Sequence, residues 1–201
     1  MNFLILGFLT GMSLILAIGA QNIFVIEQGL KKQYIFIVCL ICSISDFLLI
    51  FVGIFLFKYL NSFFTPSIEL IFNILLFVFL LNFIWGKIKY KISESSFNTD
   101  NKINHLSKIV FKTLSFTFLN PHVYSDTVFF LGNFSKGFLT VDKYYFGIGA
   151  AIASFIFFFL IGYLSKYFSQ HLKSDKIWKR INYLIILFMS ILALKVLTEI
   201  I

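Results

Sequence analysis

The chain of 201 residues is 59% hydrophobic and only 13% charged, and its formal net charge is +8. A soluble protein is usually about 45–50% apolar and about 25% charged, so a water-soluble domain of this length could not bury so much apolar surface in one core. The composition and the mean hydropathy of +0.92 predict an integral membrane protein. The basic residues flank apolar runs instead of lining one face, which argues against nucleic-acid binding.

Six apolar stretches follow one another along the chain, and each is long enough for a membrane-spanning helix of about 20 residues. They lie at 3–26, 35–57, 67–86, 109–131, 144–165 and 181–200. Period-two alternation is absent, and the runs are too long for the strands of a membrane barrel. The sequence therefore predicts an all-α integral membrane protein of about six transmembrane helices, folded as a single domain over residues 1–201.

The loops between the predicted spans differ in their basic residues. The first, third and fifth loops carry twelve lysines and arginines, and the second and fourth carry three. Because basic residues collect on the cytoplasmic side, the linker 87–108 and the other two basic loops are predicted to be cytoplasmic. Six spans then place both termini outside; an inward N-terminus with five full spans is the alternative.

The linker 87–108 divides the chain into halves of about 1–86 and 109–201, with three predicted spans each. Because each half has an odd number of spans, the second half starts on the opposite side of the membrane from the first. The pattern therefore predicts two inverted three-helix repeats. In the second helix of each half a serine precedes a glycine by eight residues, Ser45 with Gly53 and Ser154 with Gly162. Such a short match is weak support by itself.

The first helix of each half contains polar residues that predict a break. Pro121 lacks a backbone donor and clashes with the preceding turn, so Asn120-Pro121 should interrupt the fourth helix inside the membrane. Gly19, Gln21 and Asn22 predict a similar break in the first helix. Unwound backbone at that depth is tolerated only where it lines a cavity or is buried in protein. The alternatives are a simple proline kink and, for the glycines of the first helix, close helix packing.

Two carboxylates lie within predicted spans, Asp46 at the middle of the second and Asp126 in the fourth. A charge at that depth costs about 2.5–3.5 kcal/mol on insertion scales, so it indicates function. His122 lies four residues before Asp126, on the same helix face, where the two could share a proton. The alternatives are a structural Asp46 that is hydrogen-bonded to hydroxyls such as Ser43, and a His122 that is a packed donor.

Two other polar features have competing interpretations. Cys39 and Cys42 form a C-x-x-C at helical spacing, which suits a thiol–disulfide carrier or, together with Asp46, a soft-metal site. The simpler interpretation is two small apolar fillers. Lys195 and Glu199 lie near a span end at i, i+4 spacing, and they are predicted to satisfy each other or to reach the interface.

The motifs together resemble a known family. The stretches GFLTGMSLILAIGAQNIFVIEQGL (7–30), CSISDFLLIFVG (42–53) and NPHVYSDTVFFLG (120–132) are similar to the lysine exporter family. The nearest branch is that of the basic amino-acid exporters, since other branches typically show Pro-Gly-Pro where this chain has Ile18-Gly19-Ala20. The match runs in order along nearly the whole chain and is weak in the central loop. The resemblance implies six helices in pseudo-symmetric halves and efflux from the cytoplasm, with Asp46 and Asp126 at the family's intramembrane acidic positions.

We therefore hypothesise an efflux transporter, not an enzyme, that exports L-arginine, L-lysine or both across the cell (inner) membrane as a multi-pass protein. Asp46, Asp126 and His122 would neutralise the cationic side chain or carry protons. Free backbone donors and helix N-termini at the two breaks would bind the substrate carboxylate. The predicted site residues at these breaks are Gly19, Gln21, Asn22, Asn120 and Pro121.

Substrate charge predicts proton antiport, because exchange for one inward proton cancels the charge moved outward, and no nucleotide-binding loop is present. The expected partners are the substrate, protons and lipid, without a cofactor or nucleic acid, and a homo-oligomer is left open. The alternative functions are a metal-ion exporter or a membrane thiol–disulfide carrier that uses Cys39 and Cys42.

Overall fold

The computed structural model describes residues 2–16, 19–63, 65–92, 105–169 and 175–200, and the described chain is helical without strands. The prediction of an all-α fold is confirmed. In chain order the elements are α1 (Phe3–Ile15), α2 (Ala20–Lys31), α3 (Ile35–Phe63), α4 (Pro66–Ile92), α5 (Leu106–Phe118), α6 (Pro121–Tyr124), the π-helix η1 (Ser125–Phe130), α7 (Leu131–Phe134), α8 (Thr140–Ser169) and α9 (Asp175–Ile200).

Three helical stretches are long and apolar enough to cross a membrane in the described chain: Ile35–Phe57, Pro66–Gly86 and Thr140–Ser169. The bent pair α1 and α2 makes a fourth if the two count as one span. The predicted span 109–131 is divided among α5, α6, η1 and α7, and Tyr183–Thr198 of α9 is a shorter apolar helix. Six full spans thus remain a prediction.

Several helices are longer than the apolar runs that predicted them. The expected break from Lys58 to Pro66 is wrong, because α3 continues to Phe63 and α4 begins at Pro66. The expected linker 87–108 is also too long, because α4 continues to Ile92 and α5 begins at Leu106; residues 93–104 lie outside the described chain. The helices extend past the apolar runs because the lysines there remain compatible with a helix near apolar surroundings. Their aliphatic stems can cover apolar surface while their charged ends reach water.

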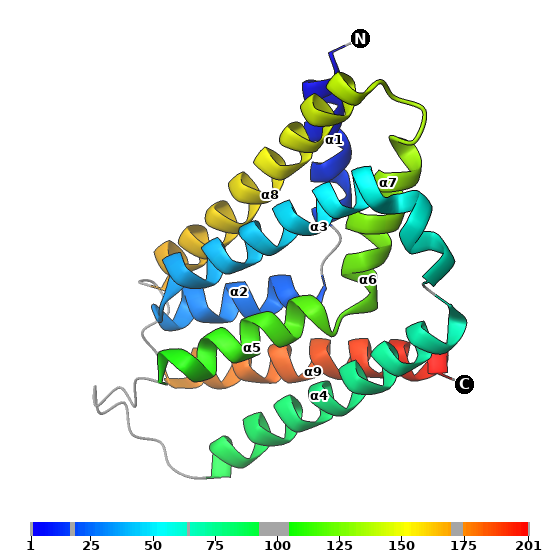
Figure 1. The fold of residues 1–201 in the computed structure, drawn as a ribbon. Helices are drawn as coiled ribbons and strands as arrows, with labels where there is room; N and C mark the ends of the chain where they lie inside the picture. The colour runs from blue at the N-terminus through cyan, green and yellow to red at the C-terminus, as the bar shows by residue number, and fades with distance from the viewer. Residues whose placement is uncertain (1, 17–18, 64, 93–104, 170–174, 201) are drawn as a thin grey trace.

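The first break lies between α1 and α2, whose axes differ by 82° (Figure 1). The predicted break near Gly19 is confirmed: Gly19 is the N-cap of α2, and Gln21 and Asn22 lie in the first turn after the break. The amide of Asn22 donates a 3.1 Å hydrogen bond to the carbonyl of Ile15, the last residue of α1. It thereby satisfies a carbonyl that a helix end leaves unpaired.

The second break falls where Asn120-Pro121 predicts it. Helix α5 ends at Phe118 and α6 begins at Pro121, a first helical position that suits proline because no donor is needed there. Asn120 Oδ1 accepts from the backbone N–H of His122 at 3.1 Å. The hydroxyl of Tyr124 donates to the carbonyl of Phe118 at 3.0 Å. Each break is therefore bridged by a side chain that bonds the last carbonyl before it.

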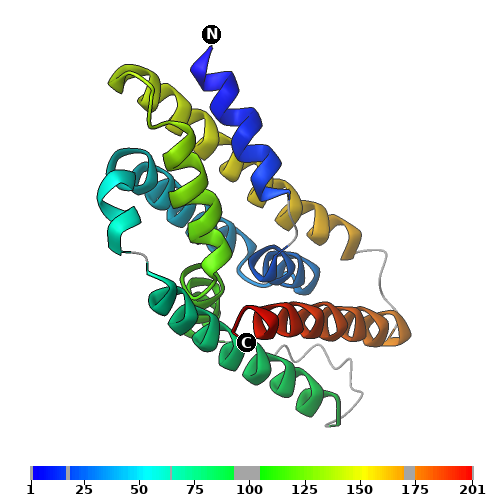
Figure 2. The same cartoon turned by 90° about the vertical axis from the view of Figure 1, so that its right-hand side faces the viewer.

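Helix α8 lies at the centre of the packing. It runs beside α1, α2 and α3, whereas α4 and α9 lie side by side along another edge of the molecule (Figures 1 and 2). Small residues allow the closest approaches. A Cβ added at Gly11 of α1 would lie 2.9 Å from Cα of Ala150 on α8. The backbones are thus too close for larger side chains, as is typical of membrane helices.

Two glycine pairs form reciprocal contacts between the halves. A Cβ added at Gly29, near the end of α2, would lie 2.5 Å from the carbonyl oxygen of Gly162 on α8. A Cβ added at Gly132 on α7 would lie 2.7 Å from the carbonyl oxygen of Gly53 on α3. In each case the broken helix of one half packs on the second helix of the other half.

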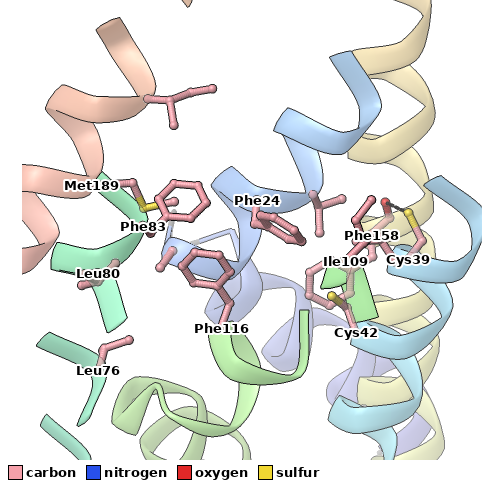
Figure 3. Packing of buried hydrophobic residues seen from close by; sticks show 14 of the residues in the cluster. Phe24, Cys39, Cys42, Leu76, Leu80, Phe83, Ile109, Phe116, Phe158 and Met189 are labelled. Carbon is pink, nitrogen blue, oxygen red and sulfur yellow. Dashed lines mark hydrogen bonds between the residues drawn. The ribbon is translucent and has the colours of Figure 1, made fainter. Parts of the chain in front are cut away.

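An aromatic cluster fills the space among α2, α4 and α5 (Figure 3). The ring of Phe116 lies 5.0 Å from that of Phe24 and 5.2 Å from that of Phe83. Lys112 places its ammonium 5.3 Å from the centre of the Phe83 ring, and Met189 of α9 packs against the same cluster. Aromatic pairs at these separations stabilise by about 0.5–1.5 kcal/mol beyond simple burial.

Candidate functional site

A cavity of about 330 Å³ lies where the two helix breaks meet. Its size is within the roughly 300–1,000 Å³ of small-molecule sites. Seven of the eight predicted site residues line it: Gly19, Gln21, Asn22, Asp46, Asn120, His122 and Asp126. The eighth, Pro121, begins α6 beside them, and its side chain lies outside the described ones. Residues far apart in the sequence thus converge on one chamber.

The two breaks face each other across a short distance. A Cβ added at Gly19 would lie 3.9 Å from Nδ2 of Asn120. Gly19, the N-cap of α2, has no side chain that could cap this helix, whereas the side chain of Asn120 caps α6. The side-chain nitrogen of Gln21 is also buried and has no hydrogen-bond partner among the described residues. The wall formed by α2 therefore offers backbone and side-chain donors to an anionic group.

Asp46 lies on α3 and is only 3% exposed. Its Oδ2 accepts a 2.8 Å hydrogen bond from the hydroxyl of Ser154 on α8. In the alternative, structural interpretation of Asp46 the partner is a hydroxyl such as Ser43. The hydroxyl that bonds Asp46 is that of Ser154, and the hydroxyl of Ser43 is buried without a hydrogen-bond partner among the described residues. Among the described residues Ser154 is the hydrogen-bond partner of Asp46, and Asp46 also borders the cavity, so its carboxylate can contact a bound cation.

Asp126 lies in the π-helix η1, one residue after its start. A π-helical turn inserted in an α-helix is frequent at functional sites because it changes which side chains share a face. Asp126 is half-buried, and it interacts electrostatically with His122, Lys195 and Asp46. The cavity thus brings both predicted carboxylates and the predicted histidine into one electrostatic environment.

Lys195 is the cavity residue that sequence reasoning placed elsewhere. It lines the chamber together with Leu192 and Val196, and it is an exposed residue. The predicted pairing with Glu199 stays a prediction, because the side chain of Glu199 lies outside the described ones. Sequence reasoning had no signal for Lys195, because a lysine near a span end has the same pattern as any interfacial lysine.

Cys39 and Cys42 lie in the hydrophobic core, where both are 0% exposed and neither forms a disulfide (Figure 3). The thiol of Cys39 donates to the carbonyl of Phe158 at 3.2 Å. Over the described part of the chain, no three His, Cys, Asp or Glu side chains gather closely enough to hold a metal ion. The surroundings of both cysteines are those of small apolar core residues.

Comparison with known proteins connects this site with a family. The model of the LysE type translocators matches residues 12–200. The arginine exporter protein ArgO of Pectobacterium atrosepticum is 33% identical over 184 residues, which cover 89% of this chain and 88% of that protein. The ArgO protein of Salmonella paratyphi A is 32% identical over 195 residues, with 96% and 92% covered.

The ArgO protein of Klebsiella pneumoniae is 33% identical over 178 residues, with 88% of this chain and 84% of that protein covered. No solved structure matches the chain. The matching proteins are exporters, and the apolar helices of this chain are those of an integral membrane protein. The family match over nearly the whole length and the identity to these relatives show that the chain belongs to the LysE type translocators.

Proposed function

We propose that this protein exports basic L-amino acids, arginine or lysine or both, from the cytoplasm. The observation that carries the proposal is the single cavity in which Asp46 and Asp126 meet the ends of two broken helices. A cationic side chain requires carboxylates, and a substrate carboxylate requires donors such as the uncapped N-terminus of α2. The similarity to arginine exporters supports the same substrate class.

The proposed architecture has six spans in two inverted repeats, within a multi-pass protein of the cell inner membrane. The reciprocal contacts of Gly29 with Gly162 and of Gly132 with Gly53 support this symmetry. So do the two bridged breaks, in which Asn22 bonds the end of α1 and Tyr124 bonds the end of α5. Substrate sites of inverted-repeat transporters lie at the repeat interface, formed by discontinuous helices. The position of the cavity, where the two helix breaks meet, supports the assignment of this site.

The proposed coupling is proton antiport. Outward movement of one positive charge against an inside-negative potential costs about 2.3 kcal/mol per 100 mV. Unaided efflux would need a concentration ratio of roughly fifty to balance that cost, since about 1.4 kcal/mol corresponds to tenfold. Exchange for one inward proton removes the net charge movement. Asp46 and Asp126 are the proposed carriers, and His122 beside Asp126 is the proposed relay.

Proteoliposomes that contain the purified full chain test both substrate and coupling. With the membrane potential clamped, an imposed pH gradient should drive labelled arginine toward the acidic side, against the proton flow. The Asp126→Asn variant should stop or uncouple this flux. Arginine flux that ignores the pH gradient would replace antiport by uniport. Wild-type protein that moves neither arginine nor lysine would overturn the proposed function itself.

A further inference from the structure

We propose that Lys195 binds the α-carboxylate of the exported amino acid and thereby makes the site reject amines that lack this group. This inference rests on the proposed export of basic amino acids and specifies how the substrate is recognised. It starts from the position of Lys195 on α9, where it lines the cavity together with Leu192 and Val196. Two other walls of the same cavity carry Asp46, on α3, and Asp126, in η1.

The charged groups of the cavity are the complement of those of a basic amino acid. Arginine and lysine each carry two cationic groups and one carboxylate at neutral pH. The described cavity lining holds two carboxylates, Asp46 and Asp126, and one ammonium, Lys195. In a cavity lined mostly by apolar surface an unmatched charge is costly, so each substrate charge favours an opposite partner. Two cations on two carboxylates leave Lys195 for the remaining anion.

Helix α9 is otherwise apolar around Lys195, with Leu194 62% exposed and Val196 3% exposed. A lysine in such a helix is costly in a bilayer, and it is rare unless it faces a cavity or an anionic partner. Lys195 borders the cavity, and its electrostatic interaction with Asp126 shows that its charge acts on the site. Its position fits binding of a ligand group in the cavity.

The uncapped N-terminus of α2 and Lys195 can serve the same carboxylate. A carboxylate has two oxygens and accepts several hydrogen bonds, so backbone donors on one wall do not exclude an ammonium on another. The helix end orients the group, and Lys195 adds a full opposite charge. Removing the carboxylate from the substrate would leave Lys195 beside two extra cations without an anion. The arrangement therefore selects against decarboxylated amines.

The test compares arginine with agmatine, which is arginine without its carboxylate, in proteoliposomes of the full chain at matched protein content. The variants are Lys195→Gln and the charge-preserving Lys195→Arg. Lys136→Gln is the matched control, because Lys136 is an exposed lysine that does not line the cavity. We expect Lys195→Gln to lower kcat/KM for arginine by about tenfold to a hundredfold, as for a lost charged hydrogen bond. Agmatine transport should stay equal or increase, and Lys195→Arg and Lys136→Gln should keep the wild-type preference.

Three results would overturn the assignment of Lys195. An equal loss for both substrates would mean that Lys195 supports packing. An equal gain for both would mean that Lys195 competes with cations as a counter-ion of Asp126. A Glu199→Gln variant with the same change of preference would attribute the effect to the i, i+4 pair. Wild-type protein that moves neither arginine nor lysine is a separate result, which removes the proposed function and this inference with it.

Discussion

Ser154 on α8 donates a 2.8 Å hydrogen bond to Asp46 on α3, and the two residues are 108 positions apart. Both side chains are buried, Ser154 at 0% and Asp46 at 3% exposure. The bond therefore joins the second helix of one half to the second helix of the other, beside the cavity. It fixes one oxygen of the carboxylate that we assign to substrate and proton binding.

The Ser154→Ala variant should remove this bond and leave a buried carboxylate oxygen without its protein partner. Loss of a buried partner typically costs about 1–3 kcal/mol, so we expect a lower melting temperature in detergent and slower arginine efflux. Ser13→Ala is the control, because Ser13 is exposed and its hydroxyl bonds only the carbonyl of Thr10 in its own helix. Equal melting temperatures for the two variants would contradict the structural role of Ser154.

The Asp46→Asn and Asp126→Asn variants should each abolish efflux without preventing membrane insertion. Asparagine preserves the shape of the side chain but cannot hold a negative charge, so the change tests charge and not packing. Insertion should persist because removal of an intramembrane charge lowers the cost of the span. Efflux assays with membrane fractions of equal protein content would measure both effects. Near-normal efflux by either variant would assign that residue a structural role.

The Gly132→Ala variant should destabilise the protein, because the added Cβ would lie 2.7 Å from the carbonyl oxygen of Gly53. Because the backbone of Gly53 cannot move aside as a flexible side chain can, we expect the free energy of unfolding to decrease by about 1–3 kcal/mol. Gly86→Ala is the matched control on α4, where the added Cβ meets nothing within 4 Å. At this position alanine should leave the free energy of unfolding unchanged or increase it by about 0.5–1 kcal/mol. Similar melting temperatures for both variants would argue against the close contact.

Replacement of Cys39 and Cys42 together by alanine should leave export largely intact. Both thiols are fully buried, and their surroundings are those of core residues. We expect reduced thermal stability from lost packing, with unchanged arginine kinetics per molecule. If the double variant reaches the membrane at the normal level and transports nothing, the thiol-carrier and metal-exporter alternatives become the better explanations.

The segment 87–108 should be cytoplasmic and the C-terminus should face outside. The reason is the excess of basic residues in the first, third and fifth predicted loops, twelve against three. Reporter fusions at Ser95 and after Ile201 would measure the two locations. Cytoplasmic activity of the reporter after Ile201 would be inconsistent with six spans and this orientation.

Local sequence signals predicted the second break and most of the candidate site. Pro121 cannot continue a preceding helix wherever it lies, so its position in an apolar run was sufficient to place the break. The first break was placed less well, because Gly19 only permits an interruption. Gln21 and Asn22 are polar residues of the following helix that a sequence pattern cannot distinguish from unwound chain.

Contacts between distant segments had no sequence signal of this kind. The pairing of Asp46 with Ser154, in preference to Ser43, depends on how α3 and α8 are rotated about their axes. Likewise, Lys195 near a helix end resembles any interfacial lysine until the packing of α9 brings it to the cavity. The spacing of Ser154 and Gly162 was visible, but its meaning came from the contacts that both residues make.

The reciprocal glycine contacts constrain how the cavity can open to its other side. Because α2 is seated on α8 and α7 on α3, a rigid rocking of one half against the other would separate both pairs at once. Helices α4 and α9 lie side by side and pack mainly on each other (Figure 2). Their residues Leu76, Leu80 and Lys195 line the cavity. The glycine contacts thus interlock one wall of the chamber, and α4 and α9 form another. An opening that preserved the glycine contacts would move α4 and α9, the last helix of each half, against the rest.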